Sequence, residues 1–371
     1  MEIEKGFKKI LDEILKKYDI GFASNVYVEE KGDTKILDIY LIDEVREMGI
    51  KLPLDRRQAT LFYGILRDFL RKRILRMGNM YTKLLKSGEL EEREKEAFER
   101  LKKCDICPHR CGVNRFERAG RCRSDYRIKV SSAFPHFGEE DCLVGTHGSG
   151  TIFLSNCPLF CVYCQNYEIS QKGEGSYVSE ERVADMMLSL QDMGCHNINL
   201  VTPTHFVPQL IRAIRIAAEG GLRIPIVYNT GGYERVETLK LLEGIIDIYM
   251  PDMKYGSNEN ALKYSGIPGY WDIVREAVKE MHRQVGDLVI RNGIAERGLL
   301  VRHLVLPNRI AGSEEVLKFL ANLSKNTYIN IMDQYIPCFK AYKYPELDRT
   351  ITREEFDEVV SFARGLGLHR I

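Results

Sequence analysis

The sequence has almost no excess of charge of either sign. Its 54 Lys and Arg residues face 53 Asp and Glu residues, which gives a formal net charge of +1. Bulk electrostatics therefore favour neither a nucleic acid nor an anionic membrane as partner. The sequence also lacks an apolar run long enough to span a bilayer, so we expect no stable insertion into a membrane.

Residues 1–20 lack the apolar stretch of a secretory signal peptide, because charged side chains recur throughout them. This pattern predicts a cytoplasmic protein. In that reducing compartment the ten cysteines are expected to bind metal or to take part in chemistry rather than to form disulfides.

Cysteine is absent from residues 1–103, and seven of the ten cysteines fall into two groups. The first group has the spacing CxxCxxxCx10C and the second has the spacing CxxxCxxC. Their members are Cys104, Cys107, Cys111 and Cys122, and then Cys157, Cys161 and Cys164. Of the three single cysteines, Cys338 follows a predicted strand. Its thiol either packs in the core or relays a hydrogen atom or an electron near the substrate.

Residues 150–371 alternate between short β-rich runs and helical patterns. Six strands are predicted, each followed by a helix: 150–156, 197–203, 224–232, 246–255, 298–308 and 328–337. This order is typical of a parallel α/β sheet with right-handed crossovers. Six units are too few for an eight-fold barrel, so we predict a partial (β/α)6 barrel whose site lies at the carboxyl edge of the strands.

The residues before the barrel predict two further parts. Helical patterns at 7–18, 55–77 and 89–103, with strands at 25–30 and 35–43, indicate a small α+β domain over residues 1–103. Residues 104–149 form a four-cysteine metal-binding module. The barrel domain then covers residues 150–371.

Three thiolates on one short loop suit a 4Fe–4S cluster, because they ligate three irons and leave the fourth open to a small molecule. The alternative is a structural zinc site, which takes four protein ligands and needs a distant fourth one, such as a histidine.

The motif CPLFCVYC, residues 157–164, resembles the CxxxCxΦC motif of radical S-adenosylmethionine (radical SAM) enzymes, with Tyr163 as the aromatic residue. The resemblance implies a 4Fe–4S cluster on Cys157, Cys161 and Cys164. In that family one electron from the cluster cleaves SAM, and the resulting 5′-deoxyadenosyl radical abstracts hydrogen. It also implies an external electron donor such as flavodoxin or ferredoxin.

Three longer stretches, TIFLSNCPLFCVYCQNYEIS, NINLVTPTHFVPQ and LLVRHLVLPN, resemble the pyruvate formate-lyase activating enzyme-like branch of that family. By this resemblance Tyr163 lies near the adenine, although a core tyrosine is the alternative. Thr202 and Thr204 stand where activating enzymes carry the Gly-Gly-Glu motif that receives the SAM amino group. The role of the neighbouring His205 stays open between a substrate contact and a core histidine.

The later strand ends supply the other residues that the resemblance implies. Asn229 and Thr230 match one polar stretch of the family, and Asp252 and Lys254 match another. Lys254 would pair with the SAM carboxylate, whereas a structural ion pair with Asp252 is the alternative. Arg302 is adjacent to His303 on the fifth strand, and side-chain alternation lets only one of the two face SAM.

The four-cysteine group fits either zinc or an auxiliary 4Fe–4S cluster, and the redox setting favours the cluster. Overall, the sequence predicts a radical SAM enzyme that abstracts hydrogen from a substrate, and the resemblance implies a glycine of a glycyl-radical enzyme as one candidate. One alternative is the radical modification of a peptide, a nucleic acid or a lipid. A non-enzymatic alternative is an iron–sulfur or zinc protein that acts as a redox sensor or scaffold.

Overall fold

The computed structural model describes residues 25–31, 34–40, 51–53 and 80–371. The chain divides into two compact units, Met1–Arg76 and Met77–Ile371. In the first unit, β1 (Asn25–Lys31), β2 (Thr34–Tyr40) and β3 (Lys51–Pro53) form an antiparallel sheet. The predicted strands at 25–30 and 35–43 thus coincide with β1 and β2 as far as Tyr40. The predicted helices at 7–18 and 55–77 lie outside the described residues, and the domain boundaries at 103 and 149 stay a prediction.

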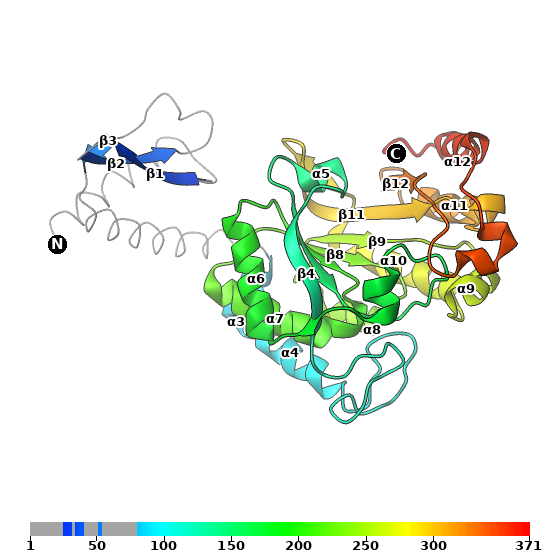
Figure 1. Ribbon diagram of the computed structural model, residues 1–371, viewed down its shortest axis with the longest axis horizontal. Helices are drawn as coiled ribbons and strands as arrows, with labels where there is room; N and C mark the ends of the chain where they lie inside the picture. The colour runs from blue at the N-terminus through cyan, green and yellow to red at the C-terminus, as the bar shows by residue number, and fades with distance from the viewer. Residues whose placement is uncertain (1–24, 32–33, 41–50, 54–79) are drawn as a thin grey trace. The chain divides into compact units, whose positions relative to one another are not determined.

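Parallel strands, among them β8 (Ile226–Thr230), β9 (Ile248–Pro251) and β11 (Ile294–Leu304), form the centre of the second unit (Figure 1). In spatial order the parallel strands are β5 (Ser149–Leu154), β7 (Ile198–Val201), β8, β9, β11 and β12 (Tyr328–Met332). Spatial order equals chain order, and every neighbouring pair is parallel. The partial (β/α)6 architecture predicted from the sequence is therefore confirmed.

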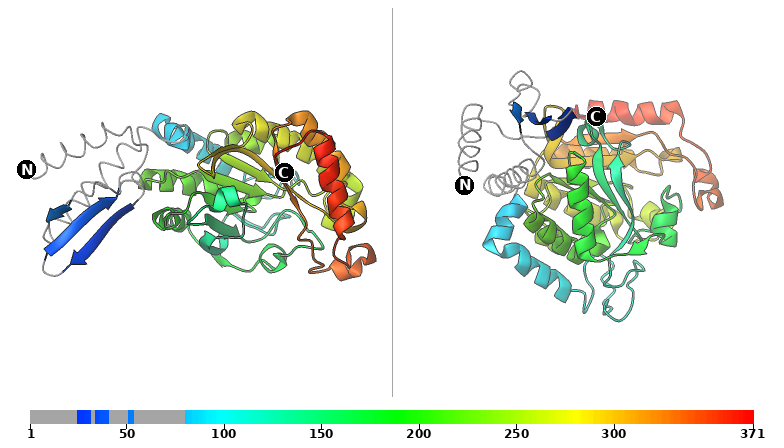
Figure 2. Two further views of the ribbon diagram at one scale, coloured as in Figure 1. Left: turned by 90° about the horizontal axis from the view of Figure 1, so that it is seen from above. Right: turned by 60° about the vertical axis from the view of Figure 1, so that its left-hand side comes forward.

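Helices follow each of these strands and cover one face of the sheet (Figure 2). They are α6 (Glu180–Asp192), α7 (Val207–Gly220), α8 (Val236–Leu241), α9 (Asn258–Ser265), α10 (Tyr270–Val285), α11 (Ser313–Leu323) and α12 (Arg353–Gly365). The 3-10 turns are Thr204–Phe206, Pro307–Arg309, Ala341–Lys343 and Pro345–Leu347. Before the barrel come α3 (Met80–Ser87) and α4 (Glu89–Glu99). The carboxylate of Glu94 on α4 accepts hydrogen bonds from Arg212 and Arg215 of α7, each at 2.7 Å.

Several elements add to the six predicted units. They are β4 (Lys129–His136), β6 (Ser176–Tyr177), β10 (Val289–Arg291), α5 (Asp141–Val144) and the π-helix Glu168–Lys172. Strand β4 pairs antiparallel with β5, and β10 forms an antiparallel hairpin with β11. The described sheet is therefore mixed, with antiparallel strands added beside β5 and β11.

Side-chain alternation gives the sheet two different faces. On the outer face, residues such as Leu200, Tyr228 and Tyr249 pack with the helices in the main core. On the opposite face, which we call the inner face, Val227 and Met250 pack in a smaller cluster with residues of α5. Among the described residues, no helix is both long enough and apolar enough to cross a membrane.

Candidate active site

The three-cysteine loop follows β5 and is held by two neighbouring segments. The backbone N–H of Phe160 donates to the carbonyl of Ser265 at 3.0 Å, and that of Val162 donates to Tyr264 at 2.9 Å. The N–H of Lys340, after β12, donates to Val162 at 2.8 Å. The end of α9 and the segment after β12 therefore fix the course of the loop.

Each of the three sulfurs has a polar contact within its own surroundings. The hydroxyl of Ser265 donates to Sγ of Cys161 at 3.0 Å, and the N–H of Leu159 donates to Sγ of Cys157 at 3.4 Å. Sγ of Cys164 lies 3.1 Å from the hydroxyl oxygen of Ser170. The contacts to Cys161 and Cys157 stabilise a thiolate more than a thiol, because there the sulfur is the acceptor.

Ionised thiols in the three-cysteine loop need positive charge nearby, because they are buried and close to one another. Loss of solvation raises the pKa of Cys157 well above its usual range and raises that of Cys161 to about 11, while the Lys254 ammonium opposes both shifts. The thiols also raise one another's pKa, so they lie within electrostatic reach of each other. Such a donor set fits the irons of a cluster, which bind thiolates and supply the missing positive charge.

No three His, Cys, Asp or Glu side chains in the described part of the chain converge on a single metal ion. A 4Fe–4S cluster does not require such convergence, because each thiolate binds a different iron.

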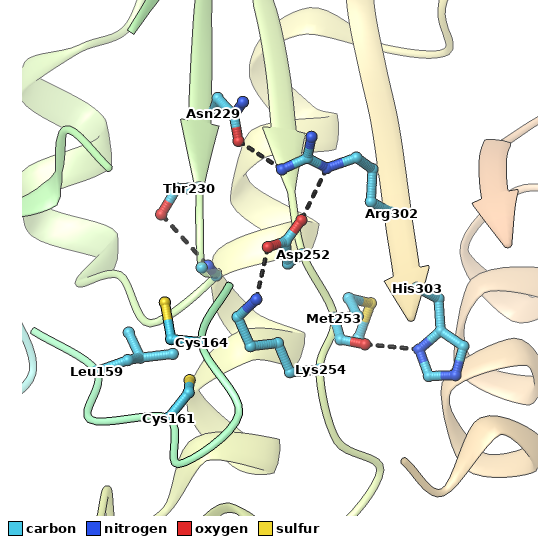
Figure 3. A network of polar contacts seen from close by, with 12 residues as sticks. Leu159, Cys161, Cys164, Asn229, Thr230, Asp252, Met253, Lys254, Arg302 and His303 are labelled. Carbon is cyan, nitrogen blue, oxygen red and sulfur yellow. Dashed lines mark hydrogen bonds and ion pairs between the residues drawn. The ribbon is translucent and has the colours of Figure 1, made fainter. Parts of the chain in front are cut away.

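A chain of alternating charges leads away from the cysteine loop (Figure 3). Nζ of Lys254 lies between the loop and Asp252, and donates to Oδ2 of that carboxylate at 2.6 Å. Nε of Arg302 donates to Oδ1 of Asp252 at 2.8 Å, and its Nη2 donates to Asn229 at 2.7 Å. Four residues from three strand ends therefore form one hydrogen-bonded group.

The protonation states in this group are fixed by its contacts. Burial alone would raise the pKa of Asp252, but Arg302 and Lys254 together hold it below its usual range. The pKa of Lys254 is raised by Asp252 and by the Cys161 sulfur, against the effect of burial. Asp252 is therefore ionised and Lys254 is charged at neutral pH.

Arg302 and His303 face opposite sides, as strand alternation requires. Arg302 lies on the inner face, whereas His303 lies on the outer face with Nδ1 2.6 Å from the carbonyl oxygen of Met253 and Nε2 2.8 Å from the Ser313 hydroxyl. Burial lowers the pKa of His303 to about 4, so this imidazole is neutral. Of the two, Arg302 is the residue placed beside the candidate site.

Two of the predicted threonines, Thr204 and Thr230, contact the buried carboxylate of Glu234, a residue that the sequence analysis did not identify. The hydroxyls of Thr204 and Thr230 donate to Oε1 of Glu234, and the Tyr228 hydroxyl donates to Oε2 at 3.2 Å. Burial raises the pKa of Glu234 to about 7. These side chains hold the second and third strand ends together on the outer side, while the N–H of Thr202 donates to the carbonyl of Asn229 at 2.8 Å.

The remaining candidates border the loop in different ways. Tyr163 is buried, with its ring centroid 6.3 Å from that of Tyr255 and 5.9 Å from that of Tyr335. His205 is buried with Nε2 2.9 Å from the carbonyl oxygen of Ser155, and burial lowers its pKa to about 3. Cys338 lies in the segment that contacts the loop through Lys340.

The thiols of the four-cysteine group lie within electrostatic reach of one another. A Cβ atom placed on Gly120 would lie 3.2 Å from Sγ of Cys111 and 3.7 Å from Sγ of Cys122. Burial raises the pKa of Cys104 and that of Cys107, and neighbouring thiols of the group raise both further.

Side chains of the four-cysteine segment reach the other loop directly. Nε2 of His109 lies 2.7 Å from the carbonyl oxygen of Pro158. The guanidinium groups of Arg121 and Arg123 lie over the Phe160 ring, at 5.9 and 5.4 Å from its centroid. The two cysteine groups therefore belong to one contiguous region.

Comparison with known proteins identifies the family. The model of the radical SAM superfamily matches residues 151–299, which include the three-cysteine loop and the ends of the first four parallel strands. The chain belongs to the radical SAM superfamily. It is 32% identical over 281 residues to the protein named "Uncharacterized protein MJ0674" of Methanocaldococcus jannaschii, a match that covers 73% of this chain and 77% of that protein.

Solved structures of the superfamily resemble parts of the chain. HydG, a maturase of the [FeFe]-hydrogenase, is 13% identical with a TM-score of 0.41, and the match covers 58% of this chain and 48% of HydG. Methylornithine synthase (PylB) is 16% identical with a TM-score of 0.39, and the match covers 56% of this chain and 59% of PylB. The chain thus spans about half the length of each of these two proteins, and the likeness bears on neither substrate nor partner.

Membership makes this radical SAM protein an enzyme that uses a 4Fe–4S cluster and SAM. The match does not single out the pyruvate formate-lyase activating enzyme-like branch.

Proposed function

We propose that Cys157, Cys161 and Cys164 hold the SAM-cleaving cluster and that the enzyme abstracts hydrogen from a substrate held against the inner face. The observation that carries this proposal is the position of the Lys254 ammonium between the cysteine loop and Asp252. When bound, the cluster and SAM supply a 5′-deoxyadenosyl radical, which takes one hydrogen atom and becomes 5′-deoxyadenosine.

Lys254 pairs with the carboxylate of SAM in this proposal. Asp252 holds the Lys254 ammonium in place through one hydrogen bond. Because Arg302 also pairs with Asp252, the ammonium is not needed in full to neutralise that carboxylate, and its remaining N–H groups can bind a ligand. Asn229 and Thr202 line the adjoining strand ends. Tyr163 borders the adenine from the cysteine loop, while Thr204 and Thr230 act through Glu234 to hold the strand ends.

For the four-cysteine group we propose an auxiliary 4Fe–4S cluster on Cys104, Cys107, Cys111 and Cys122, with zinc as the alternative. Support comes from the direct contact of this segment with the cysteine loop through His109 and Pro158. Flavodoxin or ferredoxin is the proposed electron donor.

We propose two candidate classes of substrate. The resemblance to activating enzymes supports a glycine of a glycyl-radical enzyme, whereas the altered strand end at Thr202 and Thr204 supports a different substrate, modified at a C–H bond. Incubation with deuterated candidates discriminates between them, because only the true substrate transfers deuterium into 5′-deoxyadenosine.

The proposed chemistry is tested with protein reconstituted without oxygen, in the presence of dithionite and SAM. Wild type should form 5′-deoxyadenosine, and Cys161→Ser should form at most about 1% as much. Cys195→Ser is the matched control, because Cys195 is a buried thiol before the start of β7 whose sulfur contacts the His147 carbonyl and lies outside both cysteine groups. Equal product from Cys161→Ser and wild type would refute the proposal.

A further inference from the structure

The segment between β4 and α5 joins the two edges of the parallel sheet. Strand β4 pairs with β5 at one edge, whereas α5 packs against β11 and Glu140 receives a hydrogen bond of 2.9 Å from Asn330 on β12. Residues 137–140 therefore cross the inner face and carry two adjacent carboxylates, Glu139 and Glu140, onto it.

This segment extends the chain of charges that begins at the cysteine loop. Nη1 of Arg302 donates to Glu139 at 3.3 Å, and the Glu139 side chain is only 7% exposed. The hydrogen-bonded group contains two carboxylates, those of Asp252 and Glu139, and two permanent cations, those of Lys254 and Arg302. Buried charges in proteins are normally paired, so the neighbouring carboxylate of Glu140 needs a partner outside this group.

Glu140 is the carboxylate whose pairing is incomplete. Its Oε1 accepts from Asn330, whereas its Oε2 is buried and has no hydrogen-bond partner within the described residues. His136 pairs with Glu139 and not with Glu140, since its Nδ1 lies 3.7 Å from the Glu139 carboxylate and has no hydrogen-bond partner within the described residues. Burial and the neighbouring charge of Glu140 raise the pKa of Glu139, against the opposing effect of Arg302.

A second group on the same face points to a ligand independently. Asn199 on β7 is fully buried, and neither its Oδ1 nor its Nδ2 has a partner among the described residues. Its neighbours Ile198 and Leu200 pack with the outer helices, so Asn199 faces inward. An unsatisfied buried amide destabilises the folded state, and a bound polar group would remove that cost.

Apolar surface accompanies these polar groups. Phe153 on β5, Val201 on β7 and Met332 on β12 lie on the inner face and are only partly buried. The Phe153 ring contacts those of Phe134 and His136, with centroids 5.7 and 5.8 Å away.

We propose that the inner face binds the ammonium group of an aliphatic amine, with Glu140 as its counter-ion, Asn199 as a second acceptor and the partly buried apolar residues against its carbon chain. This inference rests on the proposed function, since it names the class of substrate that the radical would attack. SAM itself is also cationic, but its proposed partner Lys254 lies on the far side of Asp252 and Arg302 from Glu140.

The proposal is tested by isothermal titration of the full chain, purified without oxygen, with 1,5-diaminopentane and its neutral analogue 1,5-pentanediol. Wild type should bind the diamine and not the diol, and Glu140→Gln should raise the dissociation constant of the diamine at least about tenfold. Glu92→Gln, which removes an exposed carboxylate on α4, should bind like wild type. Equal affinity in wild type and Glu140→Gln, or no diamine binding by wild type, would overturn the proposal.

A second variant and a second ligand keep the result interpretable. Asn199→Leu should melt no lower than wild type, because it removes an unsatisfied amide, and should bind the diamine at least about threefold more weakly. Unchanged binding by Asn199→Leu would overturn the placement on the inner face. Saturating SAM should leave diamine binding intact, whereas competition would assign the site to SAM.

Formation of 5′-deoxyadenosine by wild type, measured in parallel, separates the two proposals. If product forms but the diamine does not bind, the substrate class is wrong and the proposed function stands. If no product forms under any condition, the proposed function fails whatever the diamine does.

Discussion

Ser265 is the residue with the most direct influence on the proposed cluster, because its hydroxyl donates to the Cys161 sulfur. Hydrogen bonds to cluster sulfurs favour the more negative, reduced state. Ser265→Ala should therefore make the midpoint potential of the cluster more negative, as measured by redox titration followed by electron paramagnetic resonance.

Ser257→Ala is the control for that experiment. Ser257 caps the N-terminus of α9, the helix that ends at Ser265, and loss of the Ser257 hydroxyl should cost about 1 kcal/mol of stability. The potential should stay unchanged in this variant. An equal shift in both variants would mean that α9 acts through its position and that the sulfur contact has no specific role.

Lys254→Gln tests the role of the ammonium at residue scale. It removes one charge-assisted contact, worth about 1.5–3 kcal/mol, so SAM affinity should fall about 10- to 100-fold in an equilibrium binding assay. Lys263→Gln is the control, since Lys263 pairs with Glu346 at the exposed surface of α9. Unaltered SAM affinity in Lys254→Gln would leave the lysine as a purely structural partner of Asp252.

The sequence predicted the residues whose spacing is local but not those defined by distant contacts. Cys157, Cys161, Cys164 and Lys254 stand in motifs, and the fold brings them together. Ser265 lies 104 positions from Cys161, and Glu139 meets Arg302 across 163 positions. Only tertiary structure reveals such pairs, although the three consecutive acids Glu139, Glu140 and Asp141 were a visible signal.

At the scale of elements, the pairing of β8 with β9 depends on a buried carboxyl group. Oδ2 of Asp247, just before β9, accepts from the N–H of Ile226 at 2.9 Å, and burial raises its pKa to about 7. The folded state therefore keeps a proton that the unfolded chain loses near pH 4. Stability contributed by this group is present below pH 4 and is lost as pH rises to about 7.

Asp247→Asn removes this dependence while keeping the acceptor oxygen. Relative to wild type, the variant should gain stability between about pH 4 and pH 7 and hold that gain above pH 7. Urea unfolding at several pH values measures the difference. A constant difference across this range would show that Asp247 ionises normally in the folded protein.

The six parallel strands were predictable because each is a short apolar run followed by a helix with period 3.6. Strands β4 and β10 were missed for physical reasons: both are antiparallel additions, the sequence of β4 is only half apolar, and β10 has only three residues. The crossing segment between β4 and α5 was missed with them. The position of this segment depends on contacts with both edges of the sheet, and a local sequence pattern does not reveal such contacts.

For the whole molecule, metal content distinguishes the account from its alternatives. With two clusters, anaerobically reconstituted protein should contain about eight irons per chain, and Cys107→Ser combined with Cys122→Ser should contain about four. Iron and zinc are quantified by mass spectrometry. About four irons and one zinc in wild type would assign zinc to the four-cysteine group and leave the SAM-cleaving cluster in place.

The most direct test of the central claim is the electron paramagnetic resonance spectrum of the dithionite-reduced protein, recorded with and without SAM. A variant lacking Cys107 and Cys122 isolates the cluster on Cys157, Cys161 and Cys164. The account predicts a reduced 4Fe–4S signal that changes when SAM binds the open iron. A signal that SAM leaves unchanged, or the absence of any cluster on these three cysteines, would contradict it.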